Sequence, residues 1–274
     1  MEAHSVPISP DIRRGFVDID AGQVHYRTLR AVPVSGALPL VCLHQSPFSS
    51  LTYQEVLPSL GAARPVVAFD TPGFGESFRP ARKPTIGDYA AWLHDATRAC
   101  GLPRFDLIGV FTGAAIAVEL AVRHPAAVRR LVLLGPPLFT AAQQEQYLAN
   151  AWPRRPVADG SHLLPEWQRV MTRALPDVPF ARRCDAFQEF WRGGADAIWG
   201  EEAVSVYPLR EALPRLTQRV LVVEPDGLLG RAEEAAGLIP GAARVRLEGV
   251  HAWSMMQTAP DRVAAAACSF LDGD

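Results

Sequence analysis

The clearest pattern in the chain is a series of short, continuous apolar runs separated by longer amphipathic or polar stretches. The runs occupy residues 38–43, 65–69, 105–110, 129–135, 219–223 and 243–247. An apolar run of this kind is typical of a strand that is buried on both faces of a parallel sheet. Helical patterns lie between the runs; residues 85–101, for example, begin at an N-cap threonine and end at a glycine. This alternation predicts an α/β fold with a mostly parallel, doubly wound sheet.

Two stretches depart from that alternation. Residues 16–29 alternate around Ala21-Gly22, which predicts a β-hairpin at an antiparallel edge of the sheet, with His25 as a strand residue rather than a ligand. Residues 137–216 contain helix-length segments rich in Gln, Arg, Pro and Trp. We interpret them as a helical cap inserted into a core made of residues 1–136 and 217–274.

Aromatic side chains are concentrated in the predicted cap. Four of the six tryptophans lie there, at Trp152, Trp167, Trp191 and Trp199. Most of these rings are expected to pack inside the cap, but a lid over a small-molecule pocket is usually lined by such rings. The pattern therefore favours a hydrophobic or aromatic small molecule as the substrate.

Composition limits the possible partners and the location. The chain has 274 residues, 49% of them apolar, and a formal net charge of −2, so it can bury one large core and shows no basic surface for nucleic acid or an acidic membrane. The four cysteines have neither paired nor metal-type spacing. The first residues lack a signal-peptide pattern, and no segment is long and apolar enough to span a membrane. We expect a cytoplasmic protein; the sequence does not indicate its oligomeric state.

Residues 105–119, FDLIGVFTGAAIAVE, join one apolar run directly to the start of a helix. Where a strand turns straight into a helix, the strand and the first helical turn come very close, and a Cβ two residues to either side of the tip would clash. Gly109 and Gly113 occupy those two positions, and Phe111 lies between them. The spacing predicts a tight strand–helix turn with an aromatic residue at its tip.

This turn resembles the nucleophile elbow of the α/β-hydrolase family, where the pattern G-x-S-x-G presents a serine at the top of the sheet. Residues 44–47 (HQSP) are similar to the family's His-Gly-x-Pro, with Gln45 in place of glycine, and residues 70–77 (DTPGFGES) match its D-x-P-G-x-G-x-S loop. Asp226 and His251 follow the last two predicted strands in the family's order. The resemblance covers nearly the whole chain outside the cap and implies an α/β-hydrolase fold.

The resemblance also implies roles for particular residues. Asp226 and His251 take the roles of the acid and the catalytic histidine, and the backbone N–H groups of Ser46 and Thr112 take those of the oxyanion hole. The side chains at positions 45, 46 and 111 would face the substrate pocket. Asp70 and Ser77 are expected to form structural turns. Whether Glu224 or Asp226 holds the histidine stays open, with Asp226 favoured by its position in the loop.

The residue at the tip determines which chemistry is possible. Phenylalanine can neither attack a carbonyl nor lose a proton, so Phe111 excludes a covalent intermediate at that position. A histidine with an acidic partner can still act as a general base. We therefore expect an enzyme without metal or cofactor that acts on a hydrophobic carbonyl compound by His-Asp acid/base catalysis, as a lyase, decarboxylase, cyclase or cofactor-free oxygenase of specialised metabolism.

Two alternatives remain from the same residues. One is a hydrolase, cleaving an ester or a C–C bond, in which His251 activates water or in which Ser46 or Thr112 attacks. The other is a pseudoenzyme that binds a ligand without turning it over. The presence of both Asp226 and His251 favours the two catalytic hypotheses, because neither residue is needed to hold the fold.

Overall fold

An eight-stranded sheet forms the centre of the computed structural model, which describes residues 9, 11–30, 36–151, 156–175, 177–227 and 232–273. Its strand order is β1-β2-β4-β3-β5-β6-β7-β8. In chain order the strands are β1 (Ile12–Ile19), β2 (Gly22–Leu29), β3 (Leu40–Leu43), β4 (Val66–Phe69), β5 (Phe105–Val110), β6 (Val128–Leu134), β7 (Arg219–Asp226) and β8 (Ala243–His251). β1 pairs with β2 and β2 with β4 in antiparallel fashion, and every other pair is parallel. The predicted mostly parallel sheet with an antiparallel edge hairpin is confirmed.

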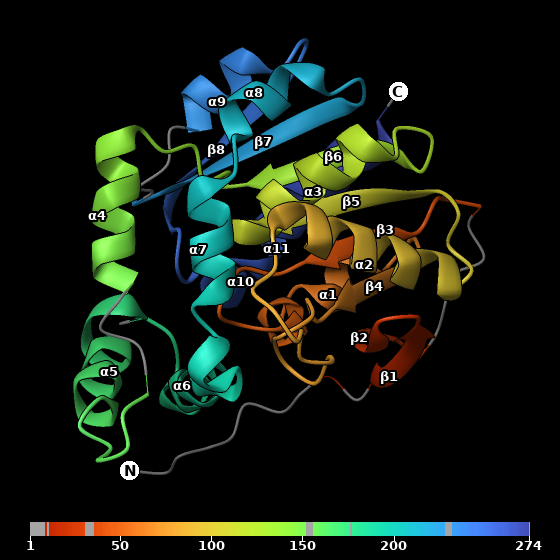
Figure 1. Cartoon of the computed structure of the whole chain (residues 1–274). Helices are drawn as coiled ribbons and strands as arrows, with labels where there is room; N and C mark the ends of the chain where they lie inside the picture. The colour runs from red at the N-terminus through yellow and green to blue at the C-terminus, as the bar shows by residue number, and fades with distance from the viewer. Residues whose placement is uncertain are drawn as a thin grey trace.

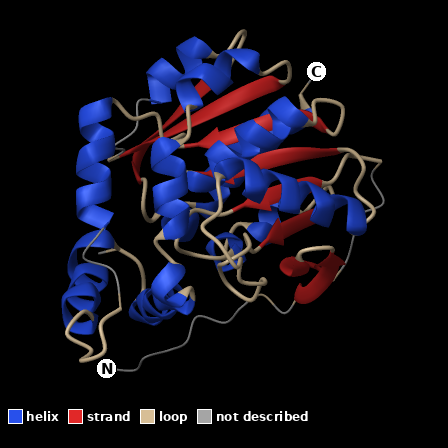
Figure 2. Ribbon diagram, in the orientation of Figure 1, coloured by secondary structure: helices blue, strands red, loops and turns tan. Residues whose placement is uncertain are grey.

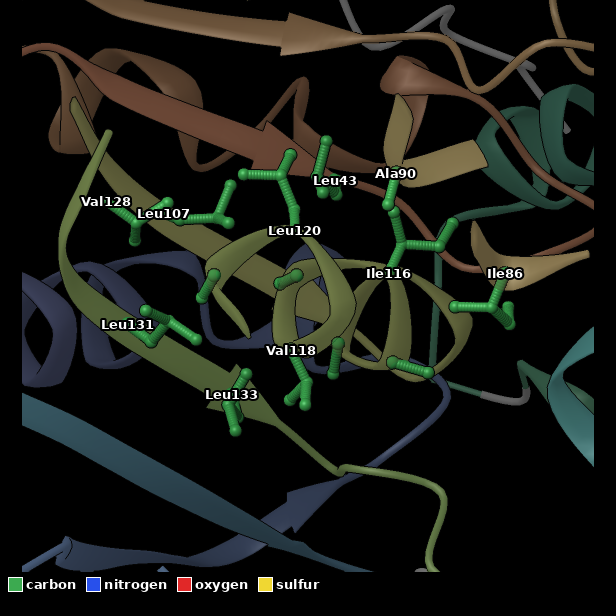
Figure 3. Close-up of a cluster of buried hydrophobic side chains, with 14 of the residues drawn as sticks. Leu43, Ile86, Ala90, Leu107, Ile116, Val118, Leu120, Val128, Leu131 and Leu133 are labelled. Carbon is green, nitrogen blue, oxygen red and sulfur yellow. The ribbon is translucent and has the colours of Figure 1, made fainter. Parts of the chain in front are cut away.

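Helices cover both faces of the sheet (Figure 2). One face packs against α2 (Ile86–Ala99), α3 (Thr112–Arg123), α8 (Leu209–Ala212) and α9 (Ala232–Leu238), and the other against α1 (Leu57–Leu60), α10 (Met255–Thr258) and α11 (Pro260–Asp272). Alternate strand residues enter the two cores: Leu107 packs in the first and Ile108 in the second. Figure 3 shows the first core, where leucine and valine side chains of β5 and β6 meet α3. This two-sided burial explains why the strands are continuously apolar.

Only helices occur between β6 and β7 in the part of the chain that the structure describes. In order they are α4 (Ala141–Ala151), α5 (Leu163–Arg169), a π-helical turn (Val170–Ala174), α6 (Phe180–Arg192), a 3₁₀ turn (Gly194–Asp196), α7 (Trp199–Val206), α8 and a second 3₁₀ turn (Leu213–Arg215). We call residues 137–216 the cap segment. Its elements α4, α5, α6 and α7 stand together beside the sheet (Figure 1). The division into core and cap domains stays a prediction, and Trp152 lies outside the described residues.

Local signals predicted the start of α2 and missed the shape of the segment after β3. Thr85 caps α2 and forms a reciprocal capping box with Asp88, as its sequence indicates. The segment after β3 forms a 3₁₀ turn, Ser50–Tyr53, followed by the single-turn α1, and the sequence pattern did not indicate this shape. No helix among the described residues has the length and hydropathy required to cross a bilayer.

Candidate functional site

The turn between β5 and α3 has the strained geometry that its glycine spacing predicts. Phe111 at its tip has φ 47° and ψ −109° and is the one non-glycine residue with positive φ in the described part of the chain. A Cβ on Gly109 would lie closer than 3.0 Å to the backbone of Gly113, and a Cβ on Gly113 would come equally close to the carbonyl oxygen of Leu43. Real Cβ atoms do not approach backbone this closely. Both positions therefore require glycine, and the ring of Phe111 is held above the carboxyl end of β5.

A small cavity of about 30 Å³ lies over this turn. Its lining residues come from the loop after β3, the turn itself, the cap segment and the ends of β6, β7 and β8: Gln45, Ser46, Phe111, Thr112, Gly135, Pro137, Phe139, Tyr147, Val204, Gly227 and Trp253. We call this space the elbow cavity. Because a water molecule needs roughly 10–15 Å³ measured in this way, the elbow cavity has room for two or three waters or for one small polar group such as a carbonyl.

The ring of Phe111 is stacked on the indole of Trp253, with 4.9 Å between ring centroids and 24° between ring planes. Trp253 is 37% exposed, so solvent reaches one side of the pair. Aromatic pairs of this kind are worth about 0.5–1.5 kcal/mol beyond their buried area. A planar ligand could therefore displace the indole from Phe111 at modest cost. Trp253 was not among the predicted site residues, although it follows His251 by only two residues.

The two residues predicted to supply oxyanion donors, Ser46 and Thr112, both line the elbow cavity. Thr112 is the first residue of α3, where N–H groups have no partner within the helix, and Ser46 lies in the loop after β3. Among the described residues neither N–H donates a hydrogen bond to a protein acceptor. The side chain of Ser46 packs against Gly200 of α7, where a Cβ would overlap its Oγ. Both predicted oxyanion donors thus lie beside Phe111, at the positive end of a helix dipole.

The loop that carries Ser46 is braced from below by two buried side chains. The Nδ1 of His44 donates to the carbonyl oxygen of Gln45 over 2.9 Å, and its Nε2 accepts from the N–H of Thr71 over 2.8 Å. Burial lowers the pKa of His44, which keeps this imidazole neutral. His44 therefore fixes the loop and has no ring nitrogen left for proton transfer.

Asp70, the second brace, accepts from the N–H groups of Ser50 and Glu76 and from Nδ1 of His25, over 2.7, 2.9 and 2.8 Å. Burial alone would raise the pKa of Asp70, but the hydrogen bond and charge of His25 outweigh it and lower the pKa to about 2. Ser77 donates to the carbonyl oxygen of Asp70. Asp70 and Ser77 brace the loop, in keeping with the expected structural role, while the burial of His25 against Asp70 was not anticipated.

Asp226 and His251 lie on adjacent strands but do not touch through a hydrogen bond or ion pair in the part of the chain that the structure describes. Their Cα atoms are paired at the ends of β7 and β8, after a bulge that skips residues 248–250. This bulge brings the N–H of Gly249 within 2.8 Å of the Asp226 carboxylate, which also pairs with Arg246 over 3.1 Å. The N–H of Gly249 and the charge of Arg246 lower the pKa of Asp226. The predicted Asp226–His251 bond is therefore absent in this arrangement, because other donors occupy the carboxylate.

The imidazole of His251 is exposed and lies behind the wall of the elbow cavity. Its Nδ1 accepts from the N–H of Trp253 over 3.4 Å. Its Nε2 lies 2.9 Å from the position that a Cβ on Gly227 would take, and Gly227 lines the cavity. Glu224, the other acid considered, pairs with Arg244 instead. Four of the predicted site residues thus line the elbow cavity: Gln45, Ser46, Phe111 and Thr112. His251 does not line it, because Gly227 lies between its imidazole and the cavity.

The described residues contain no cluster of three or more His, Cys, Asp or Glu side chains suited to a metal ion. The site therefore offers backbone donors, aromatic surface and one histidine at its rim.

Comparisons with known proteins agree with this architecture. A family model described as the alpha/beta hydrolase fold matches residues 39–188, more than half of the chain. A haloalkane dehalogenase from Mycobacterium marinum is 29% identical over 254 residues, which cover 83% of this chain and 83% of that protein. A 2-hydroxymuconate semialdehyde hydrolase from a Pseudomonas species is 39% identical over 109 residues, which cover 37% of this chain and 38% of that protein. The chain thus spans well under half of that hydrolase.

The structure of an enol-lactonase from Burkholderia xenovorans superposes with a TM-score of 0.78 at 18% identity, over 94% of this chain and 100% of that one. At this identity the likeness concerns the fold alone.

Proposed function

The chain belongs to the α/β hydrolase fold family, and on that premise we propose that it is an enzyme that acts on a small hydrophobic carbonyl compound without a covalent intermediate at the β5–α3 turn. In this proposal Phe111 stands where the family presents its nucleophile and serves as an aromatic surface for the substrate. Two of the relatives that match this chain are named as a hydrolase and a dehalogenase, and others as acyltransferases. Their substrates are not transferred to it.

The observation that carries the proposal is the conformation of Phe111 beside two unused donors. A non-glycine residue at φ 47° costs on the order of 1–3 kcal/mol in strain. The turn keeps this geometry although its tip carries no attacking atom. The N–H groups of Ser46 and Thr112 would hold a carbonyl oxygen there, and each such donor is worth about 3–4 kcal/mol in a transition state.

His251 is the proposed proton-transfer group. In this proposal its imidazole moves past Gly227, which lines the elbow cavity and has no Cβ to block the Nε2 beside it, and its Cα is already opposite that of Asp226. The base removes a proton from the carbon beside the carbonyl, and the electron pair of that C–H bond moves to the oxygen held by Ser46 and Thr112. The enolate then takes the proton back from the imidazolium at the same carbon, or attacks a second carbonyl carbon, whose oxygen receives the imidazolium proton. Lyase and cyclase reactions can proceed in this way; a decarboxylase would form the same enolate by loss of CO₂ instead of a proton, and an oxygenase would require O₂ as the co-reactant that the enolate attacks.

Hydrogen–deuterium exchange tests the proton-transfer step without knowledge of the natural substrate. Phenylacetone in D₂O is followed by NMR for loss of its protons beside the carbonyl. We expect exchange faster than buffer, reduced by about 10²- to 10⁴-fold in His251→Ala because general-base catalysis contributes that much. His94→Ala, which removes a surface histidine stacked on His124, is the matched control and should leave the rate unchanged. Equal rates for wild type and His251→Ala would refute the proposal.

Ligand binding without turnover is the second candidate function. It is favoured by the stacking of Trp253 on Phe111 and by the lack of a bond between Asp226 and His251 among the described residues. Phenylacetone that binds, shifts the indole N–H resonance of Trp253 and shows no exchange would support this function.

Hydrolysis by a water that His251 activates is tested separately. Incubation with 2-hydroxymuconate semialdehyde, the compound in one relative's name, in H₂¹⁸O would detect it as ¹⁸O in the product.

A further inference from the structure

A second cavity, of about 40 Å³, adjoins the elbow cavity. Gln45 and Trp253 line both spaces, so these two side chains stand between them. The rest of its wall comes from the segment after β3, from the residue that ends the π-helical turn, from α6 and from α10: Phe48, Leu51, Thr52, Gln54, Glu55, Leu175, Arg182, Asp185, Ala186, Glu189 and Gln257. We call this space the polar cavity. It has room for two or three waters or for one small functional group.

Carboxyl groups outnumber cationic groups in this wall. The wall contains Glu55, Asp185 and Glu189 but only one guanidinium, that of Arg182; Glu189 pairs with Arg192, which is not part of the wall. Arg182 is already paired with two of these carboxyl groups: its Nε lies 2.7 Å from Glu55, although without a hydrogen bond, and its Nη1 lies 3.1 Å from Asp185. A carboxylate entering the polar cavity would therefore meet like charge, opposed by one guanidinium that these carboxyl groups already neutralise.

The walls of the polar cavity also include two glutamines whose side-chain oxygens are unpaired. Among the described residues, the side-chain oxygens of Gln45 and Gln257 are buried without a hydrogen-bond partner. Gln45 is only 7% exposed. An unpaired buried amide destabilises a fold. Gln218, a comparably buried glutamine, instead donates to the carbonyl oxygen of Ala121 over 3.0 Å. Gln45 thus keeps its acceptor free at the junction of the two cavities.

We propose that the polar cavity binds a hydrogen-bond-donating group of the substrate, a hydroxyl or an amine, and that Gln45 selects for it. This inference rests on the proposed function, since it places the carbonyl of the same molecule in the elbow cavity. The substrate then carries a carbonyl at one end and a donor at the other, with apolar atoms passing between Gln45 and Trp253.

Four fragments of nearly equal shape test the preference: benzyl alcohol, benzylamine, toluene and benzoate. Binding is measured by NMR titration of the side-chain amide resonances of Gln45 and Gln257. We expect benzyl alcohol or benzylamine to bind at least about tenfold more tightly than toluene, as one or two new hydrogen bonds supply, and benzoate to bind weakest. Equal affinities, or tightest binding by benzoate, would overturn the proposal.

Two glutamine-to-leucine variants separate the effect of Gln45 on fragment preference from a general effect on the stability of the fold. Gln45→Leu should reduce the preference over toluene to less than about threefold, because its acceptor is gone, and its Tm should equal or exceed that of wild type. Gln218→Leu, the control, should keep the preference and lower Tm, because it loses a buried hydrogen bond. A preference retained in Gln45→Leu, or a lower Tm for that variant, would contradict the proposal.

The outcomes also separate this inference from the proposed function. Fragment selection by Gln45 without any exchange of phenylacetone would support the polar cavity and refute the enzymatic proposal alone. Exchange that depends on His251, together with equal fragment affinities, would support the enzymatic proposal and refute the polar-cavity proposal alone.

Discussion

Replacing Phe111 by glycine and by alanine would measure the strain stored at the tip of the β5–α3 turn. Both variants lose the ring and its stacking on Trp253, so that loss cancels between them. They differ at Cβ: alanine keeps the unfavourable φ of 47°, whereas glycine adopts it freely.

The magnitude follows from two opposing effects. Relief of the backbone strain favours the glycine variant by about 1–3 kcal/mol, and the greater freedom of glycine in the unfolded chain opposes it by about 0.5–1 kcal/mol. The Phe111→Gly protein should therefore be more stable than Phe111→Ala, by up to about 2.5 kcal/mol. At most positions alanine is the more stable of the two.

Urea unfolding followed by circular dichroism provides the comparison, with the difference taken from the midpoints and a common slope. Ala115→Gly, at a buried position of α3 with helical backbone, is the control and should lower stability by about 1 kcal/mol. If Phe111→Ala is as stable as Phe111→Gly or more so, the tip is not strained, and the argument that the turn preserves a costly geometry for a ligand is refuted.

Three further predictions concern the support of the site. Asp70 has a folded-state pKa of about 2 against 3.8 for the free group; this depressed pKa stabilises the fold above pH 4 and the stabilisation, about 2 kcal/mol, should be lost as pH falls from 4 to 2, a loss that Asp70→Asn should abolish in acid titrations. Gly113→Ala forces a Cβ onto the backbone of Leu43 and should cost about 3 kcal/mol in urea unfolding; an unchanged midpoint would contradict this. Asp106→Asn removes the buried carboxylate that pairs with Arg64 over 2.9 Å and with Arg129, and leaves Arg64 only the more exposed Asp272 among the described residues; it should cost about 3–5 kcal/mol, whereas a Tm within about two degrees of wild type, equivalent to about 0.5–1 kcal/mol, would show that the pair is dispensable.

The sheet and the turn could be predicted because their signals are local. A strand buried on both faces must be continuously apolar, and a strand that turns directly into a helix leaves no space for Cβ atoms at Gly109 and Gly113. Both constraints act within a few residues, so the sequence states them directly. The same holds for the cap of α2 at Thr85.

The arrangement of the site depended on contacts that local sequence does not encode. A bulge at the end of β8 presents the N–H of Gly249 to Asp226, and that donor occupies the carboxylate expected to hold His251. The stacking of Trp253 on Phe111 joins residues 142 positions apart. The pairs His25–Asp70 and Arg64–Asp106 likewise join distant segments, and nothing in the spacing of those residues indicates their partners.

The most direct test of the central claim is the mass of the intact protein after incubation with a fluorophosphonate, a reagent that reacts with activated serine and threonine side chains. The account predicts an unchanged mass, because Phe111 at the tip of the turn offers no attacking atom, together with His251-dependent exchange of phenylacetone in the same preparation. An adduct on Ser46 or Thr112 would contradict it, because a covalent nucleophile would then operate beside the turn.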